Sequence, residues 1–169
     1  MDILFENSYT RTTELAKEIY QYFYFKRTIY IIFDILIGLS FLVNIVSFII
    51  NQYYYNVSVL IIAPLFFILQ FYLYFKAVKV MVSRDNEVNG GNSIHVDTIV
   101  TNEFIQNTSS TGSVNRIPYS KIKKVIQTKN LILLRSEANL VYIFCKDTFS
   151  KGTPDEFLTF LSKKGLKVK

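Results

Sequence analysis

Two long apolar runs, residues 29–50 and 57–75, are separated by six uncharged residues, 51–56. At a rise of about 1.5 Å per residue, each run is long enough as a helix to cross the roughly 30 Å hydrocarbon core of a bilayer. Because the connection is so short, the two helices must run antiparallel beside each other. The sequence therefore predicts a transmembrane helical hairpin over residues 29–75.

The basic residues around this hairpin predict its orientation. The connection contains no Lys or Arg, whereas both outer flanks do: Arg11, Lys17, Lys26 and Arg27 before the first run, and Lys76, Lys79 and Arg84 after the second. Lys and Arg are concentrated in the cytoplasmic flanks of membrane helices. We therefore expect a multi-pass protein of the cell (plasma) membrane with both termini in the cytoplasm.

Polar side chains within the hairpin require a reason to be there, and we expect five of them to make polar contacts: Asp34, Asn44, Ser47, Gln70 and Lys76. Asn44 and Ser47 share one face of the first helix, and Pro64 frees a backbone carbonyl that should lie near them. Asp34 lies close enough to the start of its run to meet Lys76 across the hairpin, and Gln70 can join them. Hydrogen bonding between the helices is the expected role, since two helices cannot enclose a pore.

Residues 1–28 precede the hairpin. Thr12 can cap a helix in which Leu15, Ile19 and Phe23 recur at helical spacing, which predicts an amphipathic lead-in helix at the lipid headgroups. A helix that binds a partner protein is the alternative. Residues 3–5 are predicted to form a short strand that docks on the C-terminal part of the chain.

The chain changes character after the hairpin. We expect a linker over residues 76–92, which ends in a glycine pair, and a domain over residues 93–169. Within this domain, six short runs have the composition and the bounding turns of β-strands: 94–100, 104–108, 114–117, 123–128, 131–135 and 140–145. His95 alternates with the apolar residues of the first run, so we expect it on the surface.

The last predicted element is a helix with clear ends. Thr153 and Glu156 have the spacing of a capping box, and Gly165 closes the helix. Its expected core face consists of Phe157, Phe160 and Leu161. An antiparallel sheet of six or seven strands followed by one amphipathic helix is the plan of a pleckstrin-homology-like (PH-like) barrel. The expected fold class is membrane α + β: a two-helix transmembrane hairpin with a cytoplasmic PH-like antiparallel β domain closed by one C-terminal helix.

Four segments of this chain resemble one family. They are residues 117–125 (IPYSKIKKV), 128–134 (TKNLILL), 141–149 (VYIFCKDTF) and 154–158 (PDEFL). They are similar to segments of the YcxB-like group of small bacterial membrane proteins, and the N-terminal half resembles the same group. The resemblance implies a two-span anchor with a PH-like cytoplasmic domain, and no established activity.

The sequence argues against an enzyme. A nucleophilic site needs a base beside the nucleophile, and the single histidine lies in a predicted strand with no catalytic signature around Cys145 or any serine. One histidine and one cysteine cannot build a zinc site or a disulfide scaffold. The glycine pair at 90–91 lacks the features of a nucleotide-binding loop. We therefore expect no catalytic residue, no metal and no cofactor.

The distribution of charge gives more information about a binding partner than the search for catalytic motifs does. Residues 80–169 carry 13 Lys and Arg against 8 Asp and Glu, a net charge of +5. Four lysines cluster within one segment and are candidate contacts to anionic lipid headgroups or to a partner protein: Lys121, Lys123, Lys124 and Lys129. A solvated basic face that keeps the domain soluble is the alternative. We expect no nucleic-acid partner, because these basic residues are not interleaved with exposed aromatic residues on a recognised nucleic-acid-binding module.

Two classes of function remain. In the first, a non-catalytic integral membrane protein uses its cytoplasmic domain to bind anionic lipid, or an unknown membrane or cytoplasmic protein, at the inner membrane surface. In the second, an immunity or protective membrane protein acts through its hairpin against a membrane-active peptide. A second copy of the chain is a further candidate partner of the hairpin. The two classes differ in where substitutions should impair function: in the domain or in the hairpin.

Overall fold

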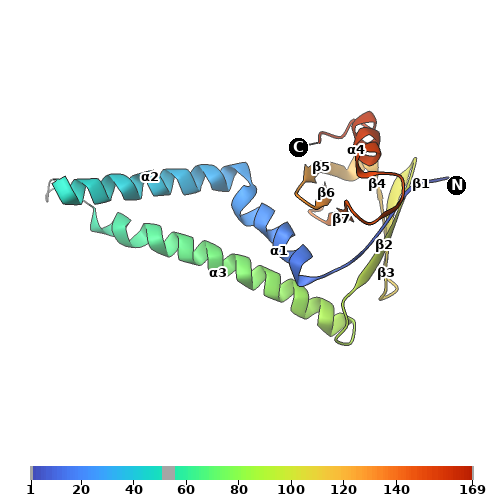
Figure 1. Cartoon of the computed structure of the whole chain (residues 1–169), viewed down its shortest axis with the longest axis horizontal. Coiled ribbons are helices and arrows are strands. Elements are labelled where there is room, and N and C mark those ends of the chain that lie inside the picture. Colours follow the sequence, from blue (N-terminus) through green and yellow to red (C-terminus); the bar gives the residue numbers. More distant parts are fainter. Residues whose placement is uncertain (1, 51–55, 169) are drawn as a thin grey trace. The chain divides into compact units, whose positions relative to one another are not determined.

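The computed structural model of the chain describes residues 2–50 and 56–168 (Figure 1). The chain forms two compact units. The hairpin unit is Thr13–Ser83, and the β unit combines Met1–Thr12 with Arg84–Lys169. The predicted connection at 51–56 lies outside the described residues, except for Asn56.

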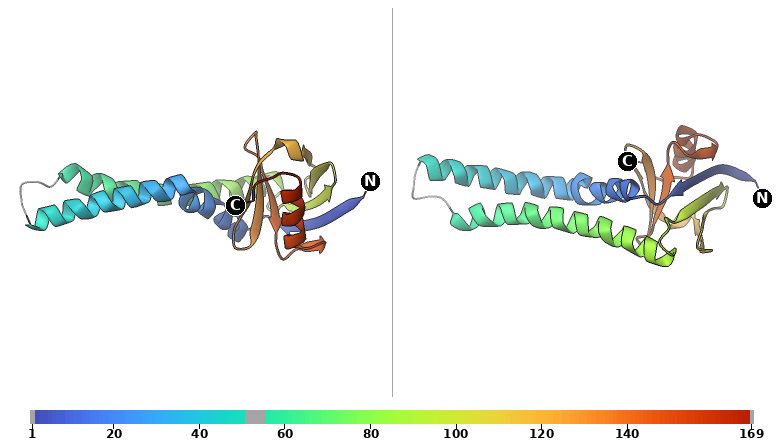
Figure 2. Two further views of the ribbon diagram at one scale, coloured as in Figure 1. Left: turned by 90° about the horizontal axis from the view of Figure 1, so that it is seen from above. Right: turned by 60° about the horizontal axis from the view of Figure 1, so that its bottom comes forward.

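The hairpin unit consists of helices. Helix α1 (Thr13–Gln21) continues into a π-helical turn, η1 (Tyr22–Lys26), and the chain then leaves the helical conformation at Arg27, with φ −76° and ψ 127°. Helix α2 (Thr28–Ile50) and helix α3 (Val57–Val88) follow and run side by side (Figures 1 and 2). Both are long and apolar enough to span a membrane. In α2 no residue is buried by protein, so its large apolar side chains need an apolar environment from elsewhere.

Helix α3 is longer than the sequence suggested. The predicted second span ended at residue 75 and was followed by a linker over 76–92, whereas α3 continues to Val88. No glycine or proline interrupts residues 76–88, and Gly90 and Gly91, both with positive φ, follow. A change from apolar to polar composition ends a membrane span but does not by itself end a helix, and α3 continues until just before these glycines.

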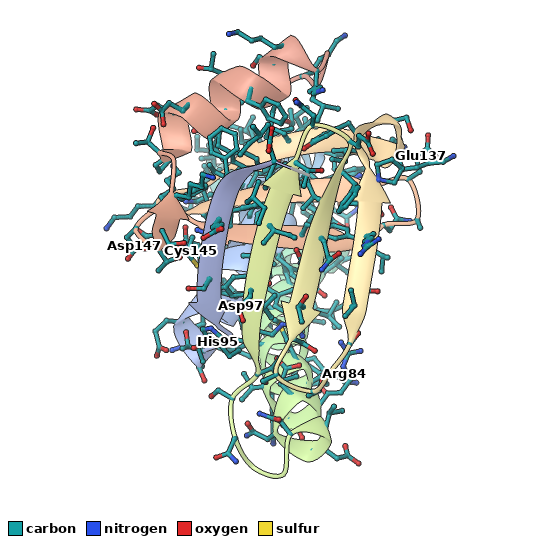
Figure 3. All side chains as sticks on the ribbon, turned by 90° about the vertical axis from the view of Figure 1, so that its right-hand side faces the viewer. Arg84, His95, Asp97, Glu137, Cys145 and Asp147 are labelled. Carbon is teal, nitrogen blue, oxygen red and sulfur yellow. The ribbon has the colours of Figure 1, made fainter. Side chains whose placement is uncertain are left out.

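The β unit contains two antiparallel sheets. Sheet A has the strand order β4-β3-β2-β1-β8, and sheet B has the order β5-β6-β7. The strands of sheet A are β1 (Ile3–Thr10), β2 (His95–Thr101), β3 (Phe104–Ser109), β4 (Val114–Pro118) and β8 (Phe149–Lys151). Those of sheet B are β5 (Ile122–Gln127), β6 (Leu131–Ser136) and β7 (Val141–Cys145). Figure 3 looks onto sheet A, with the strands of sheet B crossing behind it.

The strand β1 lies inside sheet A, between β2 and β8. The sequence predicted a strand only over residues 3–5, because polar residues follow. In the structure the strand continues to Thr10, and Phe5, Asn7 and Tyr9 alternate as its buried side chains. The chain therefore leaves sheet A after β1, forms the hairpin unit, and returns to pair β2 with β1 in antiparallel register.

The core of the β unit lies between the two sheets and helix α4 (Pro154–Lys163). The predicted capping box is present: the Thr153 hydroxyl accepts from the Glu156 N–H, and the Glu156 carboxylate accepts from the Thr153 N–H. Phe157 is fully buried and contacts Phe5 and Phe144, with ring centroids 5.3 and 4.5 Å away. The predicted order of two long apolar helices, an antiparallel β domain and one closing helix is confirmed.

Candidate functional site

The inner face of sheet A changes from apolar to polar along its strands. One row of directly paired residues is apolar and belongs to the core: Phe5, Val100, Ile105 and Ile117. Two residues further along each strand, on the same face, the paired row is polar: Asn7, Thr98, Asn107 and Asn115. We call this second set the polar row. A polar residue at an inward strand position costs free energy unless it finds partners, so the polar row requires an account of its hydrogen bonds.

The buried end of the polar row joins the two sheets. Asn7 is 2% exposed, and its Nδ2 donates to the backbone carbonyl of Cys145 at 2.8 Å and to the Thr148 hydroxyl at 3.2 Å. Its Oδ1 accepts from the Cys145 N–H at 3.2 Å. The Asn7 amide therefore satisfies both backbone groups of Cys145 at the end of β7, much as a neighbouring strand would.

The other end of the polar row opens into a cavity. The Thr98 hydroxyl donates to Asn107 Oδ1 at 3.0 Å, and Asn107 and Asn115 line a cavity of about 230 Å³. We call this cavity the polar pocket. Its remaining walls come from four segments of the β unit: Arg11 after β1, Arg84 with Asp85 and Val88 in α3, Ile94 with Val96 at the start of β2, and Ser109, Thr111 and Ser113 around the β3–β4 turn.

Two arginines and one carboxylate set the charge of the polar pocket. Arg11 Nη1 donates to Asp85 Oδ1 at 3.2 Å, and the Asp85 side chain is 7% exposed. Arg11 Nε is buried and has no hydrogen-bond partner among the described residues. Arg84 is exposed (Figure 3) and makes no ion pair within the described part of the chain. With Asp85 matched to Arg11, the pocket keeps the positive charge of Arg84.

Tyr9 is buried beside Arg11. Burial raises the pKa of Tyr9 to about 12, and the positive charge and hydrogen bond of the Arg11 side chain offset part of that rise. Burial also raises the pKa of Tyr119 and Tyr142. These phenols stay protonated at physiological pH, so they carry no charge within the β unit.

The four candidate lysines do not form one compact cluster. Lys121 ends a 3-10 turn, η2 (Tyr119–Lys121), and bonds Glu137 at 3.2 Å. Lys123 is exposed, whereas Lys124 is half-buried opposite Arg135. Lys129 is exposed in the turn after β5, at the opposite end of that strand. The structure therefore places three of these lysines at the start of β5 and one beyond its end.

The polar residues of the hairpin pair differently from the prediction. Asn44 Oδ1 accepts from the Asn56 N–H at 2.7 Å, rather than meeting the region around Pro64, and its Nδ2 donates to the Ser40 carbonyl at 2.8 Å. The second helix starts at residue 57, so the residue opposite Asn44 is the one that immediately precedes this helix. For Ser47 the structure records no hydrogen bond within the described residues.

At the other end of the hairpin, Gln70 takes the place expected for Lys76. Gln70 Nε2 donates to the Tyr24 carbonyl at 2.8 Å and to Asp34 Oδ2 at 3.3 Å. Asp34 makes no ion pair among the described residues. Lys76 instead lies over the Tyr72 ring, with its Nζ 5.9 Å from the centroid, because a helical residue readily meets a residue four positions earlier.

The single histidine and the single cysteine lie apart from the polar pocket. His95 is exposed on β2, where its ring nitrogens meet the Thr10 hydroxyl at 3.1 Å and the Asp97 carboxylate at 3.3 Å. Cys145 is buried at the end of β7. Within the described residues, no group of three His, Cys, Asp or Glu side chains could hold a metal ion.

A comparison with known families matches part of this unit. The model that describes YcxB-like proteins matches residues 100–161. This segment is YcxB-like. The predicted resemblance is confirmed over the YcxB-like segment, which runs from the end of β2 into α4 and contains Asn107, Asn115 and the four lysines. No curated protein and no solved structure gives a significant match to the chain.

The polar pocket was not predicted from the sequence. Its one visible signal was the presence of polar residues in the apolar phase of alternating strands, at Thr98, Asn107 and Asn115. That signal could not show which residues are paired, because register depends on how separate strands align. Arg11 and Arg84, 73 positions apart, meet at the pocket only because β1 and the end of α3 belong to one unit.

Proposed function

We propose that this protein is a non-catalytic integral membrane protein whose β unit binds anionic lipid at the inner surface of the cell membrane. The observation that carries the proposal is the insertion of the hairpin unit between β1 and β2, two strands paired within one sheet. Both chain connections between the units start from this sheet, so a hairpin that spans the membrane would tether the β unit twice. Two tethers restrict a domain to the membrane surface more strongly than one.

The exposed lysines support an anionic surface as the ligand. Lys121, Lys123 and Lys129 are exposed, and of these only Lys121 has a carboxylate partner among the described residues. A Lys near an anionic leaflet contributes about 1 kcal/mol of attraction. The helical hairpin, the basic flanks and the YcxB-like segment agree with this proposal, in which the domain is PH-like and both termini are cytoplasmic.

The test uses the full chain in nanodiscs, because β1 is separated from the rest of its sheet by the hairpin. A fluorophore on Ser120→Cys would report quenching by headgroup-labelled lipid. We expect strong quenching in phosphatidylglycerol discs, weaker quenching in phosphatidylcholine discs, and loss of the difference at high salt, since attraction extends only about a Debye length.

Charge-reversal variants distinguish binding by these particular lysines from a general effect of the net charge. The variant Lys121→Glu, Lys123→Glu, Lys129→Glu should lose the extra quenching in phosphatidylglycerol discs. A control with the same change of charge elsewhere, Lys151→Glu, Lys163→Glu, Lys167→Glu, should retain most of it. Equal quenching in both lipids, or equal loss in both variants, would reject lipid binding by these lysines. A partner protein would then be the ligand to seek by crosslinking in native membranes.

A further inference from the structure

We propose that the polar pocket binds a small ligand through a phosphate-type oxyanion. The pocket lies wholly within the β unit and contains none of the lysines of the proposed lipid contact. The inference is therefore independent of that contact. It rests on three features of the pocket: the supply of cationic donors, the amide and hydroxyl groups of its wall, and its size.

The cationic donors come from two arginines. Arg11 lines the pocket with a side chain that is 29% exposed, and its bonds to Asp85 and Tyr9 hold it in place. Arg84 adds a second guanidinium one residue before Asp85. Guanidinium groups bind the oxygens of phosphate and carboxylate through paired N–H donors, and they stay charged at any physiological pH.

The neutral wall of the pocket also offers donors. Asn107 Oδ1 is occupied by the Thr98 hydroxyl, which orients the Asn107 amide and leaves its Nδ2 as a donor on the pocket wall. Ser109, Thr111 and Ser113 add hydroxyls around the β3–β4 turn. An oxyanion is an acceptor with several lone pairs, so it complements a wall that combines guanidinium, amide and hydroxyl donors.

The size of the pocket limits the ligand. Its volume of about 230 Å³ is below the roughly 300–1,000 Å³ typical of sites for drug-sized molecules. Val88, Ile94 and Val96 add apolar side chains to the lining, while Asp85 disfavours a second negative group. The geometry therefore suits one phosphate-type group with a small substituent, rather than a nucleotide or a polyphosphate.

Two sources share this chemistry: a soluble phosphate ester and the headgroup of a phospholipid. The chain leaves the apolar run at residue 75 and reaches Arg84 nine residues later. Because α3 is helical through this stretch, the nine residues rise about 14 Å, so Arg84 lies within that distance of the end of the predicted span along the helix. Both sources are therefore within reach, and the experiment must distinguish them.

The experiment observes the arginine Nε–Hε signals by NMR in the full chain, in dodecyl maltoside micelles, which contain no phosphate. The soluble probe is inorganic phosphate, compared with sodium chloride at equal ionic strength. The lipid probe is phosphatidylglycerol, added in steps to the micelles. A saturable shift of the Arg11 and Arg84 signals with inorganic phosphate assigns a soluble ligand, and a shift with phosphatidylglycerol alone assigns a lipid headgroup.

Two variants test the site itself. Asn107→Asp keeps the acceptor for the Thr98 hydroxyl and the side-chain volume, but it replaces the Nδ2 donor with negative charge. Arg84→Gln removes the exposed guanidinium. Each should weaken binding of the responding probe at least tenfold, with unchanged circular dichroism. Lys123→Gln, outside the pocket, should bind like the parent chain. The proposal is overturned if neither probe shifts the signals more than chloride does, or if both pocket variants titrate like the parent chain.

Discussion

The hairpin unit and the β unit differ in how much their large apolar side chains are exposed. In the hairpin, large apolar side chains such as Phe33, Leu36 and Ile49 are more than half exposed. In the β unit, Phe144 and Phe157 are completely buried. An apolar side chain is stabilised by leaving water, whether protein or another apolar environment covers it. The β unit therefore covers its large apolar side chains with its own core, whereas the apolar side chains of the hairpin unit need an apolar environment outside the protein.

Asparagine shows the same contrast. Asn44 in the hairpin bonds within the hairpin, to the Ser40 carbonyl of its own helix and to the Asn56 N–H just before α3. Asn7 in the β unit bonds across 138 positions of sequence and ties sheet A to sheet B. Loss of the first side chain should affect a local contact, and loss of the second should affect how two sheets meet. The following predictions test this difference between the units.

The largest expected effect is the difference in stability between replacing a buried phenylalanine of the β unit and replacing an exposed phenylalanine of the hairpin. Phe157→Ala should destabilise the β unit by about 3–5 kcal/mol, because it leaves a cavity among Phe5, Phe144 and Leu161. The matched change Phe33→Ala, at a side chain 51% exposed, should cost less than about 1 kcal/mol. Denaturant unfolding of the full chain in micelles, followed through the backbone amide NMR signals of the β unit, measures both. Similar losses in the two variants would contradict the contrast between the units.

Substitutions at two separate glycines, Gly152 and Gly112, test the packing around β1. Gly152 has a φ of 76°, and an added Cβ would collide with the Phe5 ring. Gly152→Ala should therefore cost about 2–4 kcal/mol, from backbone strain and overpacking together. Gly112 has a φ of 82° with open space around it, so Gly112→Ala should cost only about 1–2 kcal/mol of strain. The same unfolding assay gives both values. If Gly112→Ala were the more damaging, β1 would not pack against Gly152 as described.

The joint between the two sheets should be sensitive to Asn7. Asn7→Ala removes the acceptor of the buried Cys145 N–H, while the Cys145 carbonyl keeps the Thr148 N–H and hydroxyl as donors, and the change should cost about 1–3 kcal/mol. Asn44→Ala in the hairpin serves as the control and should leave the unfolding of the β unit unchanged. Hydrogen exchange at the Cys145 amide gives a second measurement, because that amide should exchange faster in Asn7→Ala alone. Unchanged protection would mean that β7 is held at this point by other contacts.

The smallest effect appears at alkaline pH. The pKa of Tyr9 is raised to about 12 from 10.0, so its neutral form is favoured by folding. Its contribution is fully present below pH 10 and is lost as the pH rises towards 12. By pH 11 this loss should be about 1 kcal/mol. Tyr9→Phe should remove that part of the alkaline destabilisation, measured as unfolding free energy against pH. An equally steep loss in Tyr9→Phe would assign the alkaline effect to Tyr119 and Tyr142, whose pKa values are also raised by burial.

The elements that sequence predicted well are those with local causes. The capping residues Thr153 and Glu156 and the terminating Gly165 act within a few positions of α4, and the structure has each of them in its predicted role. The two apolar runs predicted α2 and the first part of α3, because the composition of such a run is also a local property of the sequence. The polar continuation of α3 and the three-residue strand β8 were missed, because neither has an apolar pattern of its own.

Sequence alone determined that this chain has two helices apolar enough to span a membrane and a β-rich part closed by one capped helix, because periodicity and capping are properties of neighbouring residues. Only the tertiary structure decided that β1 lies inside sheet A, that Asn7, Thr98, Asn107 and Asn115 form one row, and that Arg11 and Arg84 line one pocket. These facts depend on strand register between segments as far apart as residues 7 and 115, and local composition does not encode such a register.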